Sequence, residues 1–277
     1  MPRSFHFIPA NKPNFFKNVD SMPASAFICD LEDPVPEAKK TEARSFLQDF
    51  LVQQNSRDRF YVRINSIQSK EFGADVDMLI KLQHPFIVLP KIKSYEQFTQ
   101  CLSALRPIKG ELRAIVIAED FEILAELAQI LGSPEVYGIA AGLEDLLNSM
   151  IHSADELANL VCAFIARLSL ESKVHKKICI APVSQAIREE NDLRSYCLEM
   201  KSWGCDSMFS IHPNQLKVIN SVFGPSKMVI EAASRVVGAY EASDKSSQYF
   251  ICDGELVSKA ALIKAQRLLE ELHSEKC

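Results

Sequence analysis

Acidic residues follow several short apolar segments of the chain, in positions where they could bind a cation. These carboxylates are Asp30, Glu32 and Asp33 in FICDLEDPV, Glu119 and Asp120 in AIVIAED, and Glu144 and Asp145 after VYGIAAGL. Carboxylates gathered in a partly desolvated cavity are unfavourable unless a cation compensates their charge. Oxygen ligands without paired thiolates or histidines favour Mg²⁺, Mn²⁺ or Ca²⁺ over zinc.

Two basic residues end other apolar segments and could meet these acids. Arg63 lies in FYVRIN and Lys91 follows FIVLP. The planar guanidinium of Arg63 suits a substrate carboxylate, and a structural ion pair with Asp30 is the alternative. For Asp33, Asp120 and Glu144, capping of the next helix is an alternative to a place in the site; this choice stays open here.

The elements that would bring these residues together are short strands alternating with helices. Eight apolar runs rich in β-branched or aromatic residues span 4–9, 26–30, 60–65, 86–90, 114–119, 136–141, 177–182 and 207–213. Segments with helical spacing between them include 36–51, 121–131, 157–170 and 191–203. Continuous apolar strands indicate burial on both faces of a parallel sheet. Eight such units predict an α/β fold, the (β/α)₈ TIM barrel, rather than a doubly wound open sheet.

The C-terminal part breaks this alternation. It predicts a helix within 225–242, a strand pair within 246–257 that turns near Asp253-Gly254, and a helix over 260–272. We therefore expect a barrel over residues 1–225 and an extension over 226–277, packed on its own barrel or exchanged between barrels. In the barrel, active-site residues lie at the carboxyl ends of the strands, which is where the acids fall.

Composition narrows the class of protein. The chain has 277 residues, is 47% hydrophobic and carries a formal net charge of −5, which argues against a nucleic-acid partner. Its 8 cysteines include no C-x-x-C pair, which favours a reducing compartment. No apolar run approaches the roughly 20 residues of a membrane span, and the N-terminal segment lacks the apolar stretch of a signal peptide. We expect a cytoplasmic protein without membrane association.

Several motifs together resemble one known family. They are RSFHFIPANKP, DLEDPVPEAKKTEAR, YVRIN, VLPKIKS, IAEDFEIL, GLEDLL and SIHPNQLKVIN. Across about residues 3 to 266, the chain is similar to the citrate lyase beta subunit-like proteins of the HpcH/HpaI aldolase family. The segments DLED and IHPNQ are the most specific parts of the match.

The resemblance implies a TIM barrel, often trimeric, with Mg²⁺-dependent carbon–carbon lyase chemistry on acyl-CoA thioesters or related oxo acids. It implies that Glu119 and Asp145 bind Mg²⁺ and that Arg63 binds a carboxylate or carbonyl oxygen of the substrate. These three residues would form the catalytic group. The resemblance also places Asp30, Glu32 and Asp33 in the wall of the substrate pocket.

The chain departs from the family pattern at the expected acid/base. Many members carry an aspartate where this chain has Ser258, and a neutral serine cannot transfer that proton at pH 7. Asp253 or Glu255 could substitute for it. Ala181 and Ala10 also differ from the usual residues. Two alternatives therefore accompany the lyase: an aldolase that acts on free oxo acids without CoA, and a non-catalytic homologue that keeps the metal site.

Overall fold

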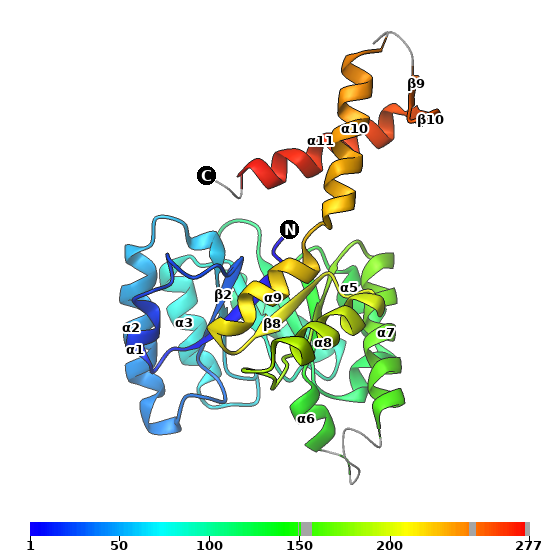
Figure 1. The fold of residues 1–277 in the computed structure, drawn as a ribbon. Helices are drawn as coiled ribbons and strands as arrows, with labels where there is room; N and C mark the ends of the chain where they lie inside the picture. The colour runs from blue at the N-terminus through cyan, green and yellow to red at the C-terminus, as the bar shows by residue number, and fades with distance from the viewer. Residues whose placement is uncertain (149, 151–156, 244–247, 275–277) are drawn as a thin grey trace. The chain divides into compact units, whose positions relative to one another are not determined.

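The computed structural model describes residues 1–148, 150, 157–243 and 248–274 (Figure 1). The chain divides into two compact units, Met1–Phe223 and Gly224–Cys277. The first unit carries the strands and helices of a barrel, and the second is a helical unit with a hairpin.

Eight parallel strands close into a barrel, in which each strand pairs with the next and β8 pairs with β1. They are β1 (Ser4–Pro9), β2 (Ala26–Asp30), β3 (Phe60–Arg63), β4 (Phe86–Leu89), β5 (Arg113–Ala118), β6 (Val136–Ala141), β7 (Ile178–Ala181) and β8 (Ser207–Ser210). The closed order confirms the predicted (β/α)₈ class and excludes the open sheet.

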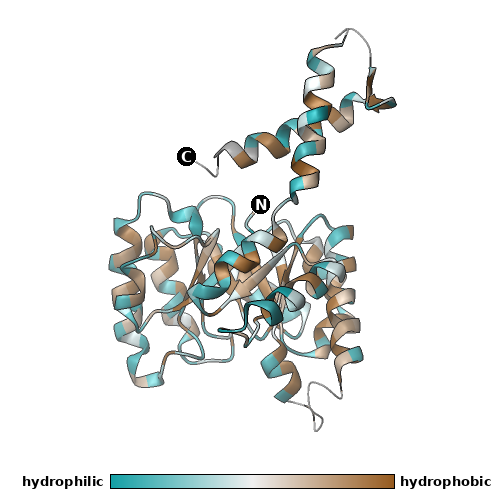
Figure 2. Cartoon of the chain, viewed as in Figure 1, coloured by the Kyte–Doolittle hydropathy of each residue, from teal (hydrophilic) through white to brown (hydrophobic). Residues whose placement is uncertain are grey.

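Helices surround the strands on the outside of the barrel (Figure 1). They are α1 (Pro13–Phe16), α2 (Lys40–Gln53), α3 (Phe72–Leu82), α4 (Tyr95–Leu105), α5 (Leu127–Gly132), α6 (Leu143–Asn148), α7 (Ala158–Val174), α8 (Glu190–Ser202) and α9 (Pro213–Phe223). Short 3₁₀ turns are η1 (Glu37–Lys39), η2 (Arg57–Arg59) and η3 (Phe121–Ala125). Figure 2 shows hydrophobic and hydrophilic residues along the same helices, as expected of helices that cover a core with one face.

The barrel strands bury both of their faces, which explains their continuous apolar runs. Phe5 and Ile28 belong to the cluster that fills the barrel interior, with the rings of Phe5 and Tyr61 5.6 Å apart. Ile8 and Phe27 alternate with them and belong to the larger core between strands and helices. Successive strand residues point to opposite faces, so an apolar residue is required at nearly every position.

The structure corrects one predicted helix. Segment 121–131 is divided into η3 and α5 because Glu126 leaves the helical conformation, with φ −123 and ψ 14. The carboxylate of Glu126 accepts the backbone N–H of Tyr95, which ties this break to the start of α4. The largest differences in strand length are in β3 and β8, which end at Arg63 and Ser210, before the predicted ends at 65 and 213.

The second unit contains α10 (Lys227–Glu241), β9 (Tyr249–Cys252), β10 (Glu255–Ser258) and α11 (Lys259–Ser274), with β9 and β10 antiparallel. Asp253 and Gly254 turn the hairpin at φ 51 and φ 82, the left-handed values that an Asp-Gly turn adopts readily. Residues 246 and 247 of the predicted strand pair lie outside the described residues. No helix in the described parts of the chain is long and apolar enough to cross a bilayer.

Candidate active site

A pocket of about 530 Å³ opens at the carboxyl ends of the barrel strands. Its wall includes Asp30, Arg63, Glu119 and Asp145, which come from the ends of β2, β3 and β5 and from the first turn of α6. The structure therefore brings the predicted catalytic group, Arg63, Glu119 and Asp145, to one pocket. Asp33 and Glu144 line it as well.

Arg63 is held by two acids of the β2 loop. Strand pairing places Asp30 beside Arg63, and the guanidinium donates from Nε to Oδ1 at 2.8 Å and from Nη2 to Oδ2 at 2.6 Å. Nη1 lies 3.1 Å from Glu32. Burial opposes the charge on Arg63, but Asp30 and Glu32 outweigh it and raise its pKa, so the guanidinium stays charged.

These ion pairs limit what Arg63 can offer a substrate. A guanidinium has five N–H donors, and three of them face Asp30 and Glu32. One N–H on each terminal nitrogen has no acceptor among the described residues, and Arg63 lines the pocket. The structural pairing with Asp30 and a role in substrate binding are thus compatible, because different donors serve each.

Glu119 has the most strongly perturbed carboxyl group of the pocket. Its pKa is raised to about 8: burial is the main cause, the negative charges of Glu32 and Asp145 act in the same direction, and the Lys91 N–H and Arg63 oppose the shift. The Lys91 backbone N–H donates to Oε2 at 2.6 Å. A carboxyl with this pKa holds its proton near neutral pH until a cation approaches and favours the charged form.

Lys91 connects the acids of two strand ends. Its ammonium lies 3.0 Å from Glu32, 2.9 Å from Asp33 and 3.6 Å from Asp145. The residue adopts φ 56, a left-handed conformation that is uncommon outside glycine. Its backbone N–H thus contacts Glu119, while its ammonium contacts Glu32, Asp33 and Asp145. Lys91 therefore links the carboxylates that follow β2 with those that follow β5 and β6.

The Glu119 side chain occupies space that is available only because residue 142 is a glycine without a Cβ. A Cβ on Gly142 would lie 2.3 Å from Cγ of Glu119 and 2.9 Å from Cγ2 of Ile117. Any larger residue would therefore displace Glu119. This requirement was not predicted from the sequence, although Gly142 begins the quoted segment GLEDLL.

A buried lysine supports the loop that carries Glu32. The Lys40 ammonium donates to the carbonyls of Leu31 at 2.8 Å and Glu32 at 2.7 Å, and to Oδ1 of Asn65 at 2.7 Å. Asn65 in turn donates to Asp75 at 2.6 Å. Lys40 belongs to the segment DLEDPVPEAKKTEAR. It supports the loop that carries Glu32 and does not line the pocket.

Asp120 does not join the pocket. Its carboxylate accepts the N–H of Glu122 at 2.9 Å, which caps η3, and it pairs with Lys93 at 2.7 Å. For this acid, the alternative of helix capping is confirmed. Hydrogen bonds to its charged form lower its pKa, with the Glu122 N–H as the main cause.

The family follows from comparison with known proteins. Residues 3–213 match the model of the HpcH/HpaI aldolase/citrate lyase family. This chain belongs to the HpcH/HpaI aldolase/citrate lyase family. The predicted family resemblance is thereby confirmed.

Individual members of the HpcH/HpaI family align over nearly the whole chain. A (3S)-malyl-CoA thioesterase of Cereibacter sphaeroides is 28% identical, covering 96% of this chain and 93% of that protein. The citrate lyase subunit beta of Leuconostoc mesenteroides is 25% identical, covering 97% and 92%. The structure of CitE from Mycobacterium tuberculosis with magnesium, acetoacetate and coenzyme A superposes with a TM-score of 0.71 at 25% identity, covering 97% of each chain.

The pocket has the donor set that a magnesium ion needs. Among the described residues, no group of three or more His, Cys, Asp and Glu side chains is arranged to hold a metal. Mg²⁺ requires less from the protein, since one or two carboxylates with waters and substrate oxygens complete six positions. Glu119 and Asp145 provide two carboxylates in one pocket. Glu32 does not line this pocket, and its buried Oε2 has no hydrogen-bond donor among the described residues, only the ion-pair contact with Arg63. These residues fit Mg²⁺.

Ser258, which replaces the family acid/base, and Asp253, one of its two possible substitutes, have local contacts in the second unit. Oγ of Ser258 accepts the N–H of Ala261 at 3.4 Å, at the start of α11. Asp253 pairs with Arg235 at 2.8 Å. Within that unit, Ser258 therefore serves the start of a helix and Asp253 an exposed ion pair.

Proposed function

We propose that this chain is a Mg²⁺-dependent carbon–carbon lyase that acts on an acyl-CoA thioester or a related hydroxy or oxo acid. The observation that carries the proposal is the convergence of Arg63, Glu119 and Asp145 on one pocket at the carboxyl ends of the strands. The relatives support the substrate class, because they include a malyl-CoA thioesterase and a CitE structure with magnesium, acetoacetate and coenzyme A.

Glu119 and Asp145 would hold the ion, and Mg²⁺ when bound supplies a Lewis acid that polarises substrate oxygens. In the cleavage direction, the β-hydroxyl of the substrate loses its proton and the adjacent carbon–carbon bond breaks. The electron pair moves to the carbon beside the thioester carbonyl, and this enolate then gains a proton. The two free N–H donors of Arg63 stabilise the developing negative charge on oxygen.

The acids of the β2 loop hold Arg63 ready for this step. Asp30 and Glu32 fix the guanidinium from one side, so its remaining donors need no reorganisation when charge develops. Lys91 places Asp33 and Glu32 near Asp145. In this arrangement Asp30, Glu32 and Asp33 shape the substrate pocket, while Glu119 and Asp145 remain for the metal.

Hydrolysis of the thioester is a second candidate function, favoured by the 28% identical malyl-CoA thioesterase. An assay with (3S)-malyl-CoA and Mg²⁺ separates the two. A lyase releases glyoxylate and acetyl-CoA, whereas a thioesterase releases malate and free CoA thiol. Parallel assays with oxaloacetate and pyruvate test the aldolase that needs no CoA. If the protein binds Mg²⁺ but turns over none of these substrates, the result supports the alternative of a non-catalytic homologue.

The family resemblance also suggests where the protein is located and how its chains assemble. We propose a cytoplasmic homo-oligomer, a trimer by family resemblance, without nucleic-acid or membrane partners. The second unit would pack on its own barrel or exchange between barrels. Sedimentation equilibrium of the full chain and of a variant that ends at Phe223 would test the assembly: a mass of one chain for the full protein contradicts it.

A further inference from the structure

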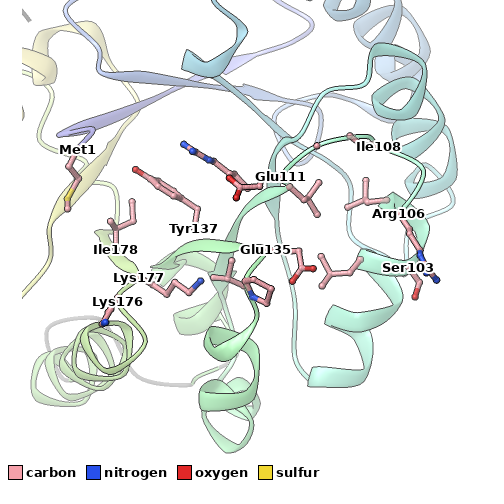
Figure 3. Close-up of a pocket in the computed structure, with 17 residues that line it drawn as sticks. Met1, Ser103, Arg106, Ile108, Glu111, Glu135, Tyr137, Lys176, Lys177 and Ile178 are labelled. Atoms are coloured by element: carbon pink, nitrogen blue, oxygen red, sulfur yellow. The ribbon is translucent and has the colours of Figure 1, made fainter. Parts of the chain in front are cut away.

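A second pocket lies at the amino ends of the barrel strands, opposite the end that carries Glu119. Figure 3 shows this pocket close up. Its volume is about 930 Å³, and its wall includes the first residues of β5, β6 and β7, which are Arg113, Val136 and Ile178. Strand β5 begins at Arg113 and ends one residue before Glu119, so roughly 20 Å of strand separates this pocket from the acidic one. The two pockets share no lining residue.

The wall of this pocket is cationic although the whole chain is acidic. Arg106, Arg113, Lys176 and Lys177 line it, against the carboxylates Glu111 and Glu135. In the described part of the chain, none of the four basic side chains forms an ion pair with a carboxylate. Since the chain carries a net charge of −5, this local excess of positive charge is not a general property of its surface.

Two of these cations are positioned by contacts of their own. The guanidinium of Arg113 lies over the rings of Phe86 and Tyr137, with its Cζ 5.9 Å from each centroid. Stacking on an aromatic ring leaves the in-plane N–H donors of an arginine available. The Lys177 ammonium donates to the carbonyl of Ser133 at 2.9 Å, which holds it beside β6.

Lys176 occupies a position where glycine is usual. It adopts φ 57 just after His175, the C-cap of α7, and its N–H donates to the carbonyl of Lys173 at 3.2 Å. The N–H of Lys177 donates to Ser172 at 2.8 Å. This pair of bonds is the Schellman motif, whose left-handed residue is most often glycine because other residues are strained there. A lysine in this position adds a second ammonium group beside Lys177.

Basic side chains lie on both sides of the pocket, and Tyr137, Glu111 and Glu135 lie between them. Figure 3 shows Lys176 and Lys177 on one side and Arg106 with Ser103 on the other. The wall also contains Leu105, Leu112 and Val136. Four basic side chains against two carboxylates complement a molecule that carries more than one negative group.

We infer that this pocket binds a small organic anion with at least two negative groups, a phosphorylated or polycarboxylic metabolite. Because the pocket lies at the amino ends of β5 and β6, its ligand is distinct from the substrate of the acidic pocket. The proposal does not depend on the lyase activity, since it rests on residues that the acidic pocket does not use.

Calorimetric titration of the full-length protein tests this site. Two probes, inorganic pyrophosphate and propane-1,2,3-tricarboxylate, are titrated separately at low salt with EDTA present, so that no metal bridges an anion to the acidic pocket. The probe that binds identifies phosphate or carboxylate as the recognised group. Arg113→Gln and Lys177→Gln are each expected to weaken binding at least about tenfold, because each removes a charged donor.

Arg194→Gln is the matched control, since Arg194 lies on α8, is exposed and does not line the pocket. It should leave the affinity unchanged. The proposal is overturned if neither probe binds, or if the affinity survives in both Arg113→Gln and Lys177→Gln. It is also overturned if Arg194→Gln weakens binding as much as they do, since the anion would then recognise the protein surface in general. Circular dichroism of each variant shows that it is folded.

Discussion

Arg63 and Asp30 lie side by side on neighbouring strands and form a two-point ion pair, with N–O distances of 2.8 and 2.6 Å. The two residues are 33 positions apart in the chain. Asp30 is the last residue of β2 and Arg63 the last of β3, so barrel register alone brings them together. This ion pair joins the ends of β2 and β3 in the wall of the candidate active site.

Arg63→Met should destabilise the barrel, because it leaves Asp30 and Glu32 buried without their cation. We expect the free energy of unfolding in urea to fall by about 3 kcal/mol. Arg63→Met combined with Asp30→Leu should recover part of this loss, since one unpaired charge is removed. The control Arg194→Met breaks an exposed pair with Glu190 and should cost less than about 0.5 kcal/mol. If Arg63→Met lowers the free energy of unfolding as little as Arg194→Met does, the ion pair between Arg63 and Asp30 does not stabilise the barrel.

Glu119→Gln should stabilise the metal-free protein at alkaline pH. The pKa of Glu119 is raised to about 8 from 4.5, so between these values the folded state binds a proton that the unfolded chain has released. Its contribution to stability is therefore lost as pH rises, by linkage. We expect Glu119→Gln to exceed the wild type by about 1 kcal/mol or more at pH 9 and to match it near pH 4.5. Urea unfolding with EDTA at both values checks this.

Glu122→Gln is the control for that comparison, because Glu122 has a side chain exposed by 68% and lies outside the pocket. A pH-independent difference between Glu119→Gln and wild type would show that Glu119 does not titrate as described.

Binding of Mg²⁺ should release a proton, because Glu119 must lose it before it can bind the ion. Affinity is expected to rise between pH 6 and pH 8 and to level off above the pKa of about 8. Calorimetry in two buffers with different ionisation enthalpies measures the proton directly. If Mg²⁺ binds with equal affinity at both values and no proton is released, Glu119 is not a ligand.

Gly142→Ala should weaken Mg²⁺ binding through Glu119, since the new Cβ would lie 2.3 Å from Cγ of that residue. We expect at least a tenfold loss of affinity, about 1.4 kcal/mol. The comparison variant is Gly73→Ala in α3, where a Cβ would meet nothing within 4 Å. Gly73→Ala should bind Mg²⁺ as the wild type does. Unchanged Mg²⁺ affinity in Gly142→Ala would show that Glu119 can move without cost.

Lys40→Met should loosen the acid loop, because the carbonyls of Leu31 and Glu32 and the amide of Asn65 lose a buried donor. The expected fall in unfolding free energy is about 2 kcal/mol. Its neighbour Lys39 provides the control, since Lys39 is 56% exposed and pairs only with exposed Glu42 among the described residues. If Lys39→Met costs as much as Lys40→Met in urea unfolding, the buried contacts of Lys40 do not support the loop.

The sequence by itself determined the barrel and the end of the barrel at which the acids gather. Strand runs buried on both faces and helices with one apolar face are local patterns, and local patterns follow from burial and backbone periodicity. The same patterns indicated Asp30, Arg63, Glu119 and Asp145, because each lies at or just after the end of an apolar run. Segment 121–131 was predicted as one helix because its apolar residues have helical spacing. The break at Glu126 accompanies a contact with Tyr95, which this spacing does not indicate.

Only the tertiary structure decided which of these residues touch. The pairing of Asp30 with Arg63 depends on strand register, and the bridge from Lys91 to Asp145 depends on barrel closure and on one left-handed residue. Asp120 looks like Glu119 in the sequence, yet it turns to cap η3. The cationic pocket assembles from loops before β5, β6 and β7 that carry no shared motif. Contacts between distant segments depend on three-dimensional packing, which short-range residue patterns do not encode.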